Sequence, residues 1–422
     1  ALQKPIQRSA AKMGSAGKSD TYDGKGKRLY IVTYGCQMND RDSEALAGLF
    51  LDRGYEMTEI VESADVILIN TCSVRDHAEN RAISFAGSLK EIARHKDTRH
   101  TSHEERTTPI KPIIGLIGCM ARNRGEDIFQ KMPHIDLIVG PAHLDKIPDF
   151  VDEIRNPKHE IRKRIIQIED EERSEALYHP LFRVEPGHAQ IVISTGCSNW
   201  CSYCVVPHVR GPLRLRTPQD IIEEVKRNVD AGIKKVTLLG QNVNDYEYTS
   251  HVTGHTTHVV NFVDLLKEID KIDGVEELSF ITNNPKNTSK ELFEVMAHSP
   301  KIVKHLHMPF QSGSNRILEL MNRGYTREKY LQLAEEYKKI TGGTLGTDVI
   351  VGFPNEAEKD FLQTEDLMRR VRFKCAFIFK YSPRPGTKAA GMPDDVTEVE
   401  KKRRHAVLLE MQKKISKENY TG

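Results

Sequence analysis

The sequence predicts an α/β protein: an N-terminal Rossmann-like parallel-sheet domain followed by a partial (β/α)6 barrel of the TIM type. Two observations support this class. Short runs rich in Ile, Val and Leu alternate with helical segments along nearly the whole chain, which favours parallel sheets covered by helices. The 422 residues also exceed what one hydrophobic core usually serves, so we expect at least two domains.

Four strands are expected in the first half of the chain, each followed by a helical segment. They are the runs 29–34, 65–70, 113–118 and 136–140. Continuous apolar runs of this length are typical of strands buried on both faces of a parallel sheet. The first half therefore predicts an open sheet with helices on its faces.

Six further strands are expected from residue 189 onward, again alternating with helices. They are the runs 189–195, 235–239, 277–282, 305–308, 346–351 and 375–381. Six such units make an incomplete barrel, whose lateral opening could admit a macromolecular substrate, and barrel chemistry lies at the carboxyl ends of the strands. The loops at those ends carry Cys197 to Cys204, Gln241, Asn242, Gln311, Ser312 and Arg384.

Composition narrows the class of protein. The formal net charge is +2, with 38% hydrophobic and 29% charged residues, which is ordinary for soluble globular proteins and excludes wholesale disorder. The longest apolar stretches are about ten residues, well short of the ~18 that cross a bilayer. Any nucleic-acid partner would have to be held by local clusters of Arg and Lys.

Composition shifts also suggest domain boundaries. We expect a flexible tail over 1–27, a first domain over 28–155, a linker or short edge strands over 156–187, a second domain over 188–404 and a C-terminal segment over 405–422. The polar, basic stretch 95–108 is expected to be a solvated loop.

The seven cysteines argue against a secreted disulfide framework, because their number is odd and the chain starts with no apolar signal segment. Cys36, Cys72 and Cys119 each follow a predicted strand. Since ligands of open α/β sheets bind at the carboxyl edge, these three thiols could converge on one site. The alternative is three unrelated buried cysteines, since free cysteine is often a small core residue.

Cys197, Cys201 and Cys204 form a C-x3-C-x2-C pattern after a strand, with the aromatic Tyr203 before the last cysteine. Three thiolates at this spacing can each bind one iron of a 4Fe-4S cluster, and the remaining iron can chelate a small molecule. Structural zinc is the alternative, with His208 completing a Cys3His set.

Five segments together carry a family resemblance: GCSNWCSYCVVPHVRG (196–211), LLGQNVN (238–244), HMPFQSGSNRILELMNRGYT (307–326), DVIVGFPNE (348–356) and YSPRPGT (381–387). With them the sequence resembles the radical S-adenosylmethionine (SAM) methylthiotransferases, above all those that modify dimethylallyladenosine in tRNA. The resemblance runs from about Arg28 to about Arg404. That family also carries three dispersed cysteines, matched here in YGCQMN, NTCSVR and GCMA.

The resemblance implies an enzyme that methylthiolates carbon-2 of N6-dimethylallyladenosine at position 37 of tRNA. It implies two 4Fe-4S clusters, one catalytic on Cys197, Cys201 and Cys204, and one auxiliary, sulfur-supplying cluster on the three dispersed cysteines. Two SAM molecules would be consumed, one as methyl donor and one as radical source. Threonylcarbamoyladenosine and a ribosomal-protein aspartate stay open as substrates, and a zinc-stabilised RNA-binding protein stays open as a non-enzymatic alternative.

The resemblance also suggests contacts. Cofactor-binding candidates are Tyr203, Gln241, Asn242, Gln311, Asp348, Gly352 and Phe353; substrate-binding candidates are Arg210, Arg214, Arg216 and Arg384. The simpler alternatives are a core aromatic for Tyr203, a turn-closing amide for Gln241, and an ordinary strand end with a glycine turn for 348–353. Cys375 is expected in the core. The run 401–404 is expected to be a solvated helical face rather than an RNA patch.

Departures from the family pattern lie at 211–216, which lacks the usual acidic residue, and at 194–195 and 283–284. Relatives continue into an RNA-binding TRAM barrel, and 405–422 is expected to lead toward such a domain, which is absent from this sequence. The expected partners are the tRNA anticodon stem-loop, an external electron donor and a sulfur or cluster-repair donor. We expect a cytoplasmic monomer with no membrane contact.

Overall fold

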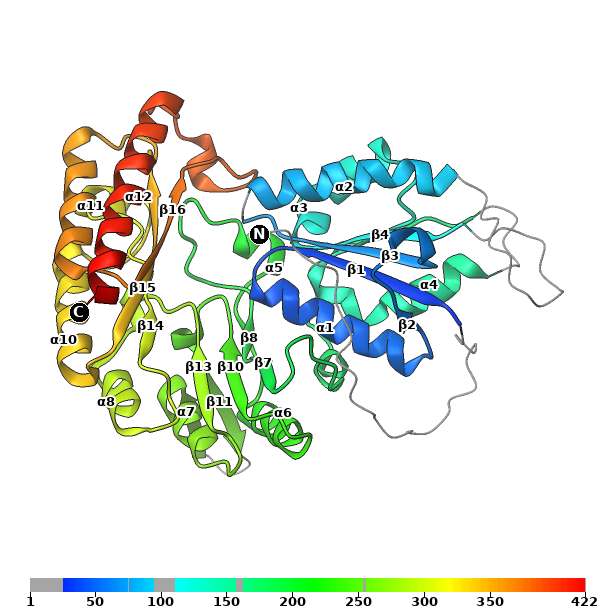
Figure 1. The fold of residues 1–422 in the computed structure, drawn as a ribbon, viewed down its shortest axis with the longest axis horizontal. Helices are drawn as coiled ribbons and strands as arrows, with labels where there is room; N and C mark the ends of the chain where they lie inside the picture. The colour runs from blue at the N-terminus through cyan, green and yellow to red at the C-terminus, as the bar shows by residue number, and fades with distance from the viewer. Residues whose placement is uncertain (1–25, 75, 95–110, 157–161, 253–255, 422) are drawn as a thin grey trace. The chain divides into compact units, whose positions relative to one another are not determined.

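The computed structural model describes residues 26–74, 76–94, 111–156, 162–252 and 256–421 (Figure 1). The chain divides into two compact units, Ala1–Pro186 and Gly187–Gly422. Most of the expected tail, and the whole of the expected loop at 95–108, lie outside the described residues. Among the described helices, none combines the length and the apolar character that crossing a membrane requires.

The first unit is built on a six-stranded, entirely parallel sheet in the order β2-β1-β3-β4-β5-β6. The strands are β1 (Arg28–Tyr34), β2 (Glu56–Met57), β3 (Val66–Thr71), β4 (Ile113–Gly118), β5 (Leu137–Val139) and β6 (Ile165–Gln167). The helices are α1 (Gln37–Asp52), α2 (Asp76–Arg94), α3 (Cys119–Lys131) and α4 (Ile147–Arg155). The four expected strands are β1, β3, β4 and β5, and the two short strands extend the edges.

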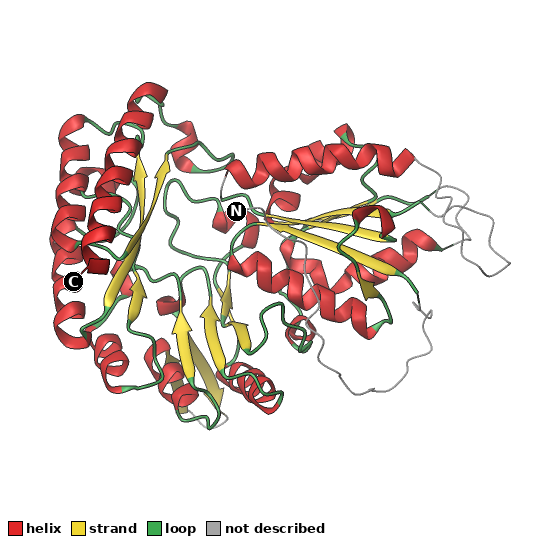
Figure 2. Cartoon of the chain, in the orientation of Figure 1, coloured by secondary structure: helices red, strands yellow, loops and turns green. Residues whose placement is uncertain are grey.

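Helices lie on both faces of this sheet (Figure 2), and an apolar core packs between each face and its helices. Along a strand, side chains alternate between faces, so Leu29 packs with α1 and α4 while Tyr30 packs with α2 and α3. The strand order reverses between β1 and β3. In open α/β sheets such a reversal opens a crevice at the carboxyl ends, where ligands bind.

The stretch 156–187, expected as a linker or edge strands, contributes to the first unit. Ile165–Gln167 pairs with β5 as an edge strand. Further on, the buried guanidinium of Arg173 donates a hydrogen bond to Asp42 in α1 over 2.6 Å. The segment is therefore attached to the sheet domain through both backbone and side-chain contacts.

The second unit contains two three-stranded parallel sheets, ordered β13-β10-β7 and β14-β15-β16, with a bridge between Leu278 and Ile302 linking the two series. These strands are β7 (His188–Val192), β10 (Lys235–Leu239), β13 (Glu277–Phe280), β14 (His305–His307), β15 (Thr344–Val351) and β16 (Cys375–Lys380). They match the six expected strands. The predicted fold class, a parallel-sheet domain followed by a partial barrel, is confirmed.

Helices follow the strands, and two short antiparallel pairs were not expected. The pairs are β8 (Ser194–Thr195) with β9 (Arg214–Leu215) and β11 (Glu247–Val252) with β12 (Thr256–Asn261). The helices are α5 (Val206–Arg210), α6 (Pro218–Asp230), α7 (Phe262–Asp270), α8 (Lys290–His298), α9 (Asn315–Leu320), α10 (Arg327–Thr341), α11 (Glu358–Val371) and α12 (Glu398–Thr421).

The expected boundary at residue 404 falls inside α12. Leu408 and Ile415 of that helix are buried, and the Gln412 amide donates a hydrogen bond to the Phe373 carbonyl over 2.9 Å. Residues up to at least Ile415 therefore belong to the core of the second unit.

Candidate functional site

Cys36, Cys72 and Cys119 follow the ends of β1, β3 and β4, and the parallel register places the ends of these three neighbouring strands level with one another. The Cys72 thiol is buried. Its pKa is raised well above the ordinary range, first by a hydrogen bond with Cys36, then by burial and by the nearby Cys36 and Cys119 thiols. The structure thus brings these three cysteines together, as expected for a single site.

Glycines allow this close approach. Gly118, directly before Cys119, has a φ of +89°, and a Cβ there would lie 2.4 Å from Asn70 Oδ1. A Cβ on Gly35, directly before Cys36, would lie 2.7 Å from Asn39 Oδ1. Both backbones pass too near a buried amide for any side chain to fit.

Those two amides link the cysteine-bearing loops. Asn39 Nδ2 donates to Asn70 Oδ1 over 2.9 Å and to the Thr71 carbonyl over 3.1 Å. Asn70 Nδ2 donates to the Asn39 carbonyl and to Ser43 Oγ, over 2.9 Å and 2.8 Å. The Cys36 thiol donates to Asn39 Oδ1 over 3.2 Å. Because both amides are fully buried, losing one partner would leave costly unpaired groups, so the network fixes the loops.

Cys197, Cys201 and Cys204 lie in the single loop between β8 and α5. The Cys204 N–H donates to the Cys201 carbonyl over 2.9 Å, closing a turn. Burial raises the pKa of the Cys204 thiol to about 12, with further contributions from Cys201 and Cys197. Burial also raises the pKa of Cys197, which feels Cys201 as well. These three thiols are therefore neighbours.

Residues 321–325 follow α9 and precede α10, and we term them the clamp segment. They hold the cysteine loop in place. The Met321 carbonyl accepts the N–H of Ser202 over 3.0 Å. The Asn322 amide donates to the Trp200 carbonyl over 3.0 Å. Arg323 Nη1 donates to Cys201 Sγ over 3.2 Å. Backbone, amide and guanidinium contacts thus grip consecutive parts of the cysteine loop.

The donor sets fit iron-sulfur clusters, which proteins hold through cysteine thiolates. In a cubane cluster each cysteine thiolate binds a different iron. The three cysteine sulfurs therefore lie farther apart than they would around a single metal ion. Among the described residues, no three His, Cys, Asp or Glu side chains group as a single ion requires. His208, needed for the zinc alternative, packs edge-on against Trp200, with ring centroids 5.7 Å apart. The zinc alternative gains no support from this geometry.

Unpaired polar atoms lie beyond the carboxyl ends of β10 and β13. Asn242 is 3% exposed, and within the described chain neither its Oδ1 nor its Nδ2 has a hydrogen-bond partner; Asn283 Oδ1 is likewise buried and unpaired. The half-buried Gln241 side chain makes no hydrogen bond to described residues, so the turn-closing alternative finds no contact. Buried amides without partners are expected where a polar ligand completes them.

Two other cofactor candidates lie on β15 or beside it. Gln311 has a φ of +63° and forms a bridge to β15: its N–H donates to the Asp348 carbonyl over 3.0 Å, and its carbonyl accepts from Ile350 over 2.9 Å. The half-buried Asp348 carboxylate lies 3.4 Å from His307 Nε2. The backbone thus brings both residues to one strand end.

The remaining cofactor candidates have packing roles. The sequence predicts a cofactor contact for Phe353. In the structure this side chain is fully buried and packs edge-on against Tyr381. Gly352 has a φ of +69°, and a Cβ there would lie 2.3 Å from Lys401 Cγ. Tyr203 packs against the same small apolar cluster as Phe353, and burial raises the pKa of its hydroxyl well above the usual range.

The candidate substrate arginines differ in exposure. Arg210 and Arg216 are buried, and Arg216 donates to Glu224 over 2.5 Å and to the Val192 carbonyl over 2.7 Å. This pairing gives Arg216 a structural role inside the unit, in place of the expected RNA contact. Arg214 and Arg384 are half-buried, which leaves them partly accessible to solvent.

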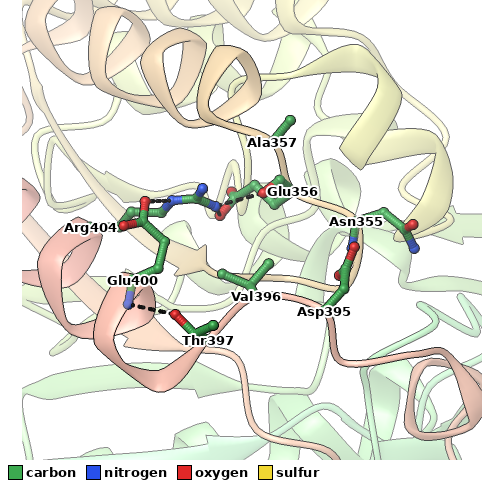
Figure 3. Close-up of a pocket in the computed structure, with 8 residues that line it drawn as sticks. All are labelled: Asn355, Glu356, Ala357, Asp395, Val396, Thr397, Glu400 and Arg404. Carbon is green, nitrogen blue, oxygen red and sulfur yellow. Dashed lines mark hydrogen bonds and ion pairs between the residues drawn. The ribbon is translucent and has the colours of Figure 1, made fainter.

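The run 401–404 departs from the expected solvated face. Lys401 and Arg404 are buried: Lys401 pairs with Asp394 over 2.6 Å, and Arg404 pairs with Glu356 over 2.8 Å. Glu356 and Arg404 are among the residues that line a pocket of about 250 Å³, and Figure 3 shows their ion pair. Helical spacing alone does not reveal that two of four consecutive cations turn inward. Cys375, expected in the core, is half-buried on β16.

Sequence reasoning missed three residues that the structure places at the sites. Asn39 and Asn70 lie in the YGCQMN and NTC segments, and Arg323 lies in MNRGYT. The available signal for the two asparagines is their position within three residues of Cys36 and Cys72, but their partners lie far away in sequence. Arg323 is more than fifty positions from any cysteine, so no local signal indicates its contact.

Two family models match the chain. One, described as the Radical SAM superfamily, matches residues 191–368, and the other, described as uncharacterized protein family UPF0004, matches residues 28–140. Each match lies within one of the two structural units.

Solved structures resemble the fold at low sequence identity. The radical S-adenosylmethionine methyltransferase TsrM from Kitasatospora setae superposes with a TM-score of 0.57 at 12% identity, covering 87% of this chain and 77% of that one. The cobalamin-dependent radical enzyme OxsB gives 0.53 at 12% identity, covering 93% and 56%. These likenesses support the fold.

Full-length relatives are much more similar. The tRNA-2-methylthio-N(6)-dimethylallyladenosine synthase of Moorella thermoacetica is 41% identical over 393 residues, covering 92% of this chain and 83% of the relative. The protein of the same name from Carboxydothermus hydrogenoformans is 42% identical over 396 residues, covering 93% and 84%. The chain belongs to the family of the tRNA-2-methylthio-N(6)-dimethylallyladenosine synthases, within the radical SAM superfamily.

Proposed function

We propose that the protein replaces the hydrogen on carbon-2 of N6-dimethylallyladenosine in tRNA, at position 37, with a methylthio group. The observation that carries this proposal is the presence of two separate cysteine triads, one in each unit of a chain whose relatives are named for that product. One triad suits radical generation and the other suits sulfur supply.

The chemistry requires a radical because an aromatic carbon–hydrogen bond is not usefully acidic, so general bases cannot activate it. Cys197, Cys201 and Cys204 would hold a 4Fe-4S cluster through three of its irons and would leave the fourth iron for SAM. With SAM bound, that group would supply the radical chemistry that such a bond requires. The protein's own task is to position the reactants and to exclude water.

Residues at the carboxyl ends of the barrel strands orient SAM in this proposal. Gln241 and Asn242 offer amide donors and acceptors that make no hydrogen bond to any described residue. Gln311 and Asp348 meet at the end of β15 and add polar groups. Arg214 and Arg384, both partly accessible, are the candidates for contacts to the RNA backbone, which is recognised mainly through its phosphates.

The first unit supplies the sulfur. Cys36, Cys72 and Cys119 would hold an auxiliary 4Fe-4S cluster, and that site would supply the sulfur for transfer, with a second SAM as the methyl donor. The buried amides of Asn39 and Asn70 keep the three thiols in place. The partners are the tRNA anticodon stem-loop, an external electron donor and a donor that rebuilds the consumed sulfur, and the enzyme works as a cytoplasmic monomer.

Mass spectrometry of tRNA nucleosides tests this function. Cells that lack the protein should accumulate N6-dimethylallyladenosine, and cells that regain it should contain the 2-methylthio derivative. Cells that regain a Cys197→Ala variant should not. Methylthiolation of threonylcarbamoyladenosine or of a ribosomal-protein aspartate instead would contradict the proposed substrate, and no change in any of the three would contradict the proposed reaction.

A further inference from the structure

Arg323 in the clamp segment is a buried cation with no carboxylate partner among the described residues. It is 8% exposed, and all five of its side-chain hydrogen bonds reach atoms that carry no fixed negative charge. Three other arginines with buried side chains are paired with acids: Arg173 with Asp42, Arg216 with Glu224, and Arg404 with Glu356. Arg323 differs from these three because it has no such partner among the described residues.

The contacts of Arg323 point it at the cysteine loop. Nη1 donates to Cys201 Sγ over 3.2 Å. The other hydrogen bonds go to neutral oxygens, those of Tyr203 Oη, Asn284 Oδ1, the Pro309 carbonyl and Tyr325 Oη, over 3.2 to 3.4 Å. The guanidinium also lies 5.2 Å from the centroid of the Tyr325 ring. Cys201 Sγ would carry a negative charge as a cluster-bound thiolate, whereas burial raises the pKa of both tyrosine hydroxyls and so keeps them neutral.

The backbone on both sides of Arg323 is shaped to present it. Asn322 has a φ of +57° and Gly324 a φ of +69°, so the chain turns through the left-handed region immediately before and after the arginine. The Arg323 N–H also donates to the Leu318 carbonyl over 3.0 Å, at the end of α9. These features hold the side chain in one direction.

Burying an unpaired guanidinium is costly, because the charge loses its hydration and gains no anion in exchange. We propose that Arg323 is a positioning residue whose charge is balanced by the Cys197–Cys201–Cys204 site when those thiolates hold a cluster, and that this charge raises the cluster's reduction potential. The inference rests on the proposed function of that triad. Donation from a cation to a thiolate is a charge-assisted hydrogen bond, which is stronger than a neutral one.

The effect on reduction follows from charge. Reduction transfers one electron from an external one-electron donor, so the site gains one negative charge. A fixed cation within hydrogen-bond distance of a ligand sulfur stabilises the reduced state more than the oxidised state, and a buried setting strengthens this interaction. Hydrogen bonds to the sulfurs and net charge are among the factors that set iron-sulfur potentials.

The test isolates one cluster. In the full chain, Cys36, Cys72 and Cys119 are changed to Ala, so that iron and paramagnetic signals report only the second triad. Arg323→Met removes the charge and keeps the length of the side chain; Arg323→Lys keeps the charge; Tyr325→Phe removes one support of the guanidinium. Arg327→Met is the matched control, because that nearby arginine pairs with Asp366 and contacts no cysteine.

Iron per chain and the midpoint potential, from a titration followed by electron paramagnetic resonance, are measured for each variant. Arg323→Met should hold iron but be at least tenfold harder to reduce, a fall of about 59 mV for a one-electron couple. Tyr325→Phe should shift the potential the same way by less. The midpoint potential of Arg323→Lys should lie between that of Arg323→Met and that of the protein with Arg323 intact. Arg327→Met should leave the midpoint potential unchanged.

Other results are also decisive. A folded Arg323→Met that loses iron while Arg323→Lys keeps it also supports charge balance. An unchanged potential in an iron-loaded Arg323→Met overturns the proposal, as does loss of iron from both the Met and the Lys variants. If Arg323→Met does not fold, unchanged potentials in Arg323→Lys and Tyr325→Phe overturn it. If the triple-Ala protein with Arg323 intact binds no iron, the function proposed for the loop triad is refuted, and the inference fails with it.

Discussion

Cys36, Cys72 and Cys119 come from three separate strand ends, whereas Cys197, Cys201 and Cys204 come from one loop. The dispersed triad depends on the register of a parallel sheet and on two buried asparagine amides that link its loops. The loop triad has its spacing fixed by the chain itself, and the clamp segment holds it from outside.

The surroundings of the triads differ in charge as well. A neutral amide contacts one thiol in each triad, Asn39 at Cys36 and Asn199 at Cys197, and in the loop triad a buried guanidinium also contacts Cys201. In the functions that we propose for the two triads, a nearby cation suits a site that takes up electrons, and neutral surroundings suit a site that holds and releases sulfur. On that proposal, the groups that contact the cysteines give the same ligand type two chemical roles.

The largest expected effect separates the triads directly. Changing Cys197, Cys201 and Cys204 together to Ala should lower the iron of anaerobically reconstituted protein from about eight to about four atoms per chain, as one of two four-iron clusters is lost. Cleavage of SAM to 5′-deoxyadenosine should stop. Iron analysis and chromatography measure both. Full retention of iron, or stoichiometric zinc in its place, would refute the assignment.

The complementary variant should lose only sulfur transfer. With Cys36, Cys72 and Cys119 changed to Ala, SAM cleavage with a strong reductant should continue, because the other ligands lie in a unit with its own core. No methylthio group should reach tRNA. Circular dichroism checks folding, and Cys375→Ala should keep both activities. A folded triple variant that still methylthiolates tRNA would show that these cysteines are not the sulfur source.

The glycines before the cysteines give the next largest effect. A Cβ on Gly196 would lie 2.0 Å from the Pro212 carbonyl oxygen, so Gly196→Ala should cost about 3 kcal/mol or more in unfolding free energy. Gly118→Ala should cost less, since the nearest backbone atom to its Cβ, the Thr71 carbonyl oxygen, would lie 2.7 Å away. Gly232→Ala, where φ is +85° and no atom lies within 4 Å, isolates the backbone strain, about 1 kcal/mol.

Urea denaturation of the apoproteins measures these three glycine variants. Equal losses in all three would mean that conformational strain alone, and not the close approach at the cysteine loops, requires glycine there.

Removing one amide should affect the dispersed triad alone. Asn70→Ala removes one partner of the buried Asn39 amide and the hydrogen bonds that Asn70 donates to Asn39 and Ser43, and we expect a loss of about 2 to 3 kcal/mol in the stability of the first unit. Iron at the first triad should fall while SAM cleavage persists. Asn80→Ala, an exposed position in α2, should stay within about 0.5 kcal/mol of the parent. Normal iron content in Asn70→Ala would remove the amide network from the account.

The smallest effect is expected away from both triads. The hydrogen bond from Arg403, and then the one from Arg404, lowers the pKa of Glu400 to about 2. Because the pKa of Glu400 is lower in the folded state, its ionised carboxylate stabilises that state at pH values above the unfolded pKa near 4.5. This stabilisation is lost as the pH falls toward 2. Since this pair is partly solvated, Glu400→Gln should cost less than about 1 kcal/mol at pH 7 and nothing near pH 2.

Denaturation of apoprotein at both pH values measures the Glu400 effect. Iron content should be unchanged at both triads. A loss of iron would show that the surroundings of Glu400 are coupled to a cluster site.

The sequence by itself determined the main strands, the fold class and the positions of the six cysteines, three of them after strand ends and three in one loop. These signals are local: runs of apolar residues specify buried parallel strands, and the spacing of Cys197, Cys201 and Cys204 within one loop is written directly in the chain. It could not reveal the β11–β12 hairpin, because period-two patterns in short polar strands are weak.

Only the tertiary structure decided which polar residues serve the sites. Arg216 and Arg404 are buried beside acids from other helices or loops, Phe353 lies in the core, and Arg323 reaches Cys201 from a segment far along the chain. Some of these contacts join residues that are more than a hundred positions apart in the sequence. No local periodicity encodes such contacts. A side chain's charge is read from the sequence, but its partner, and therefore its role, is set by packing.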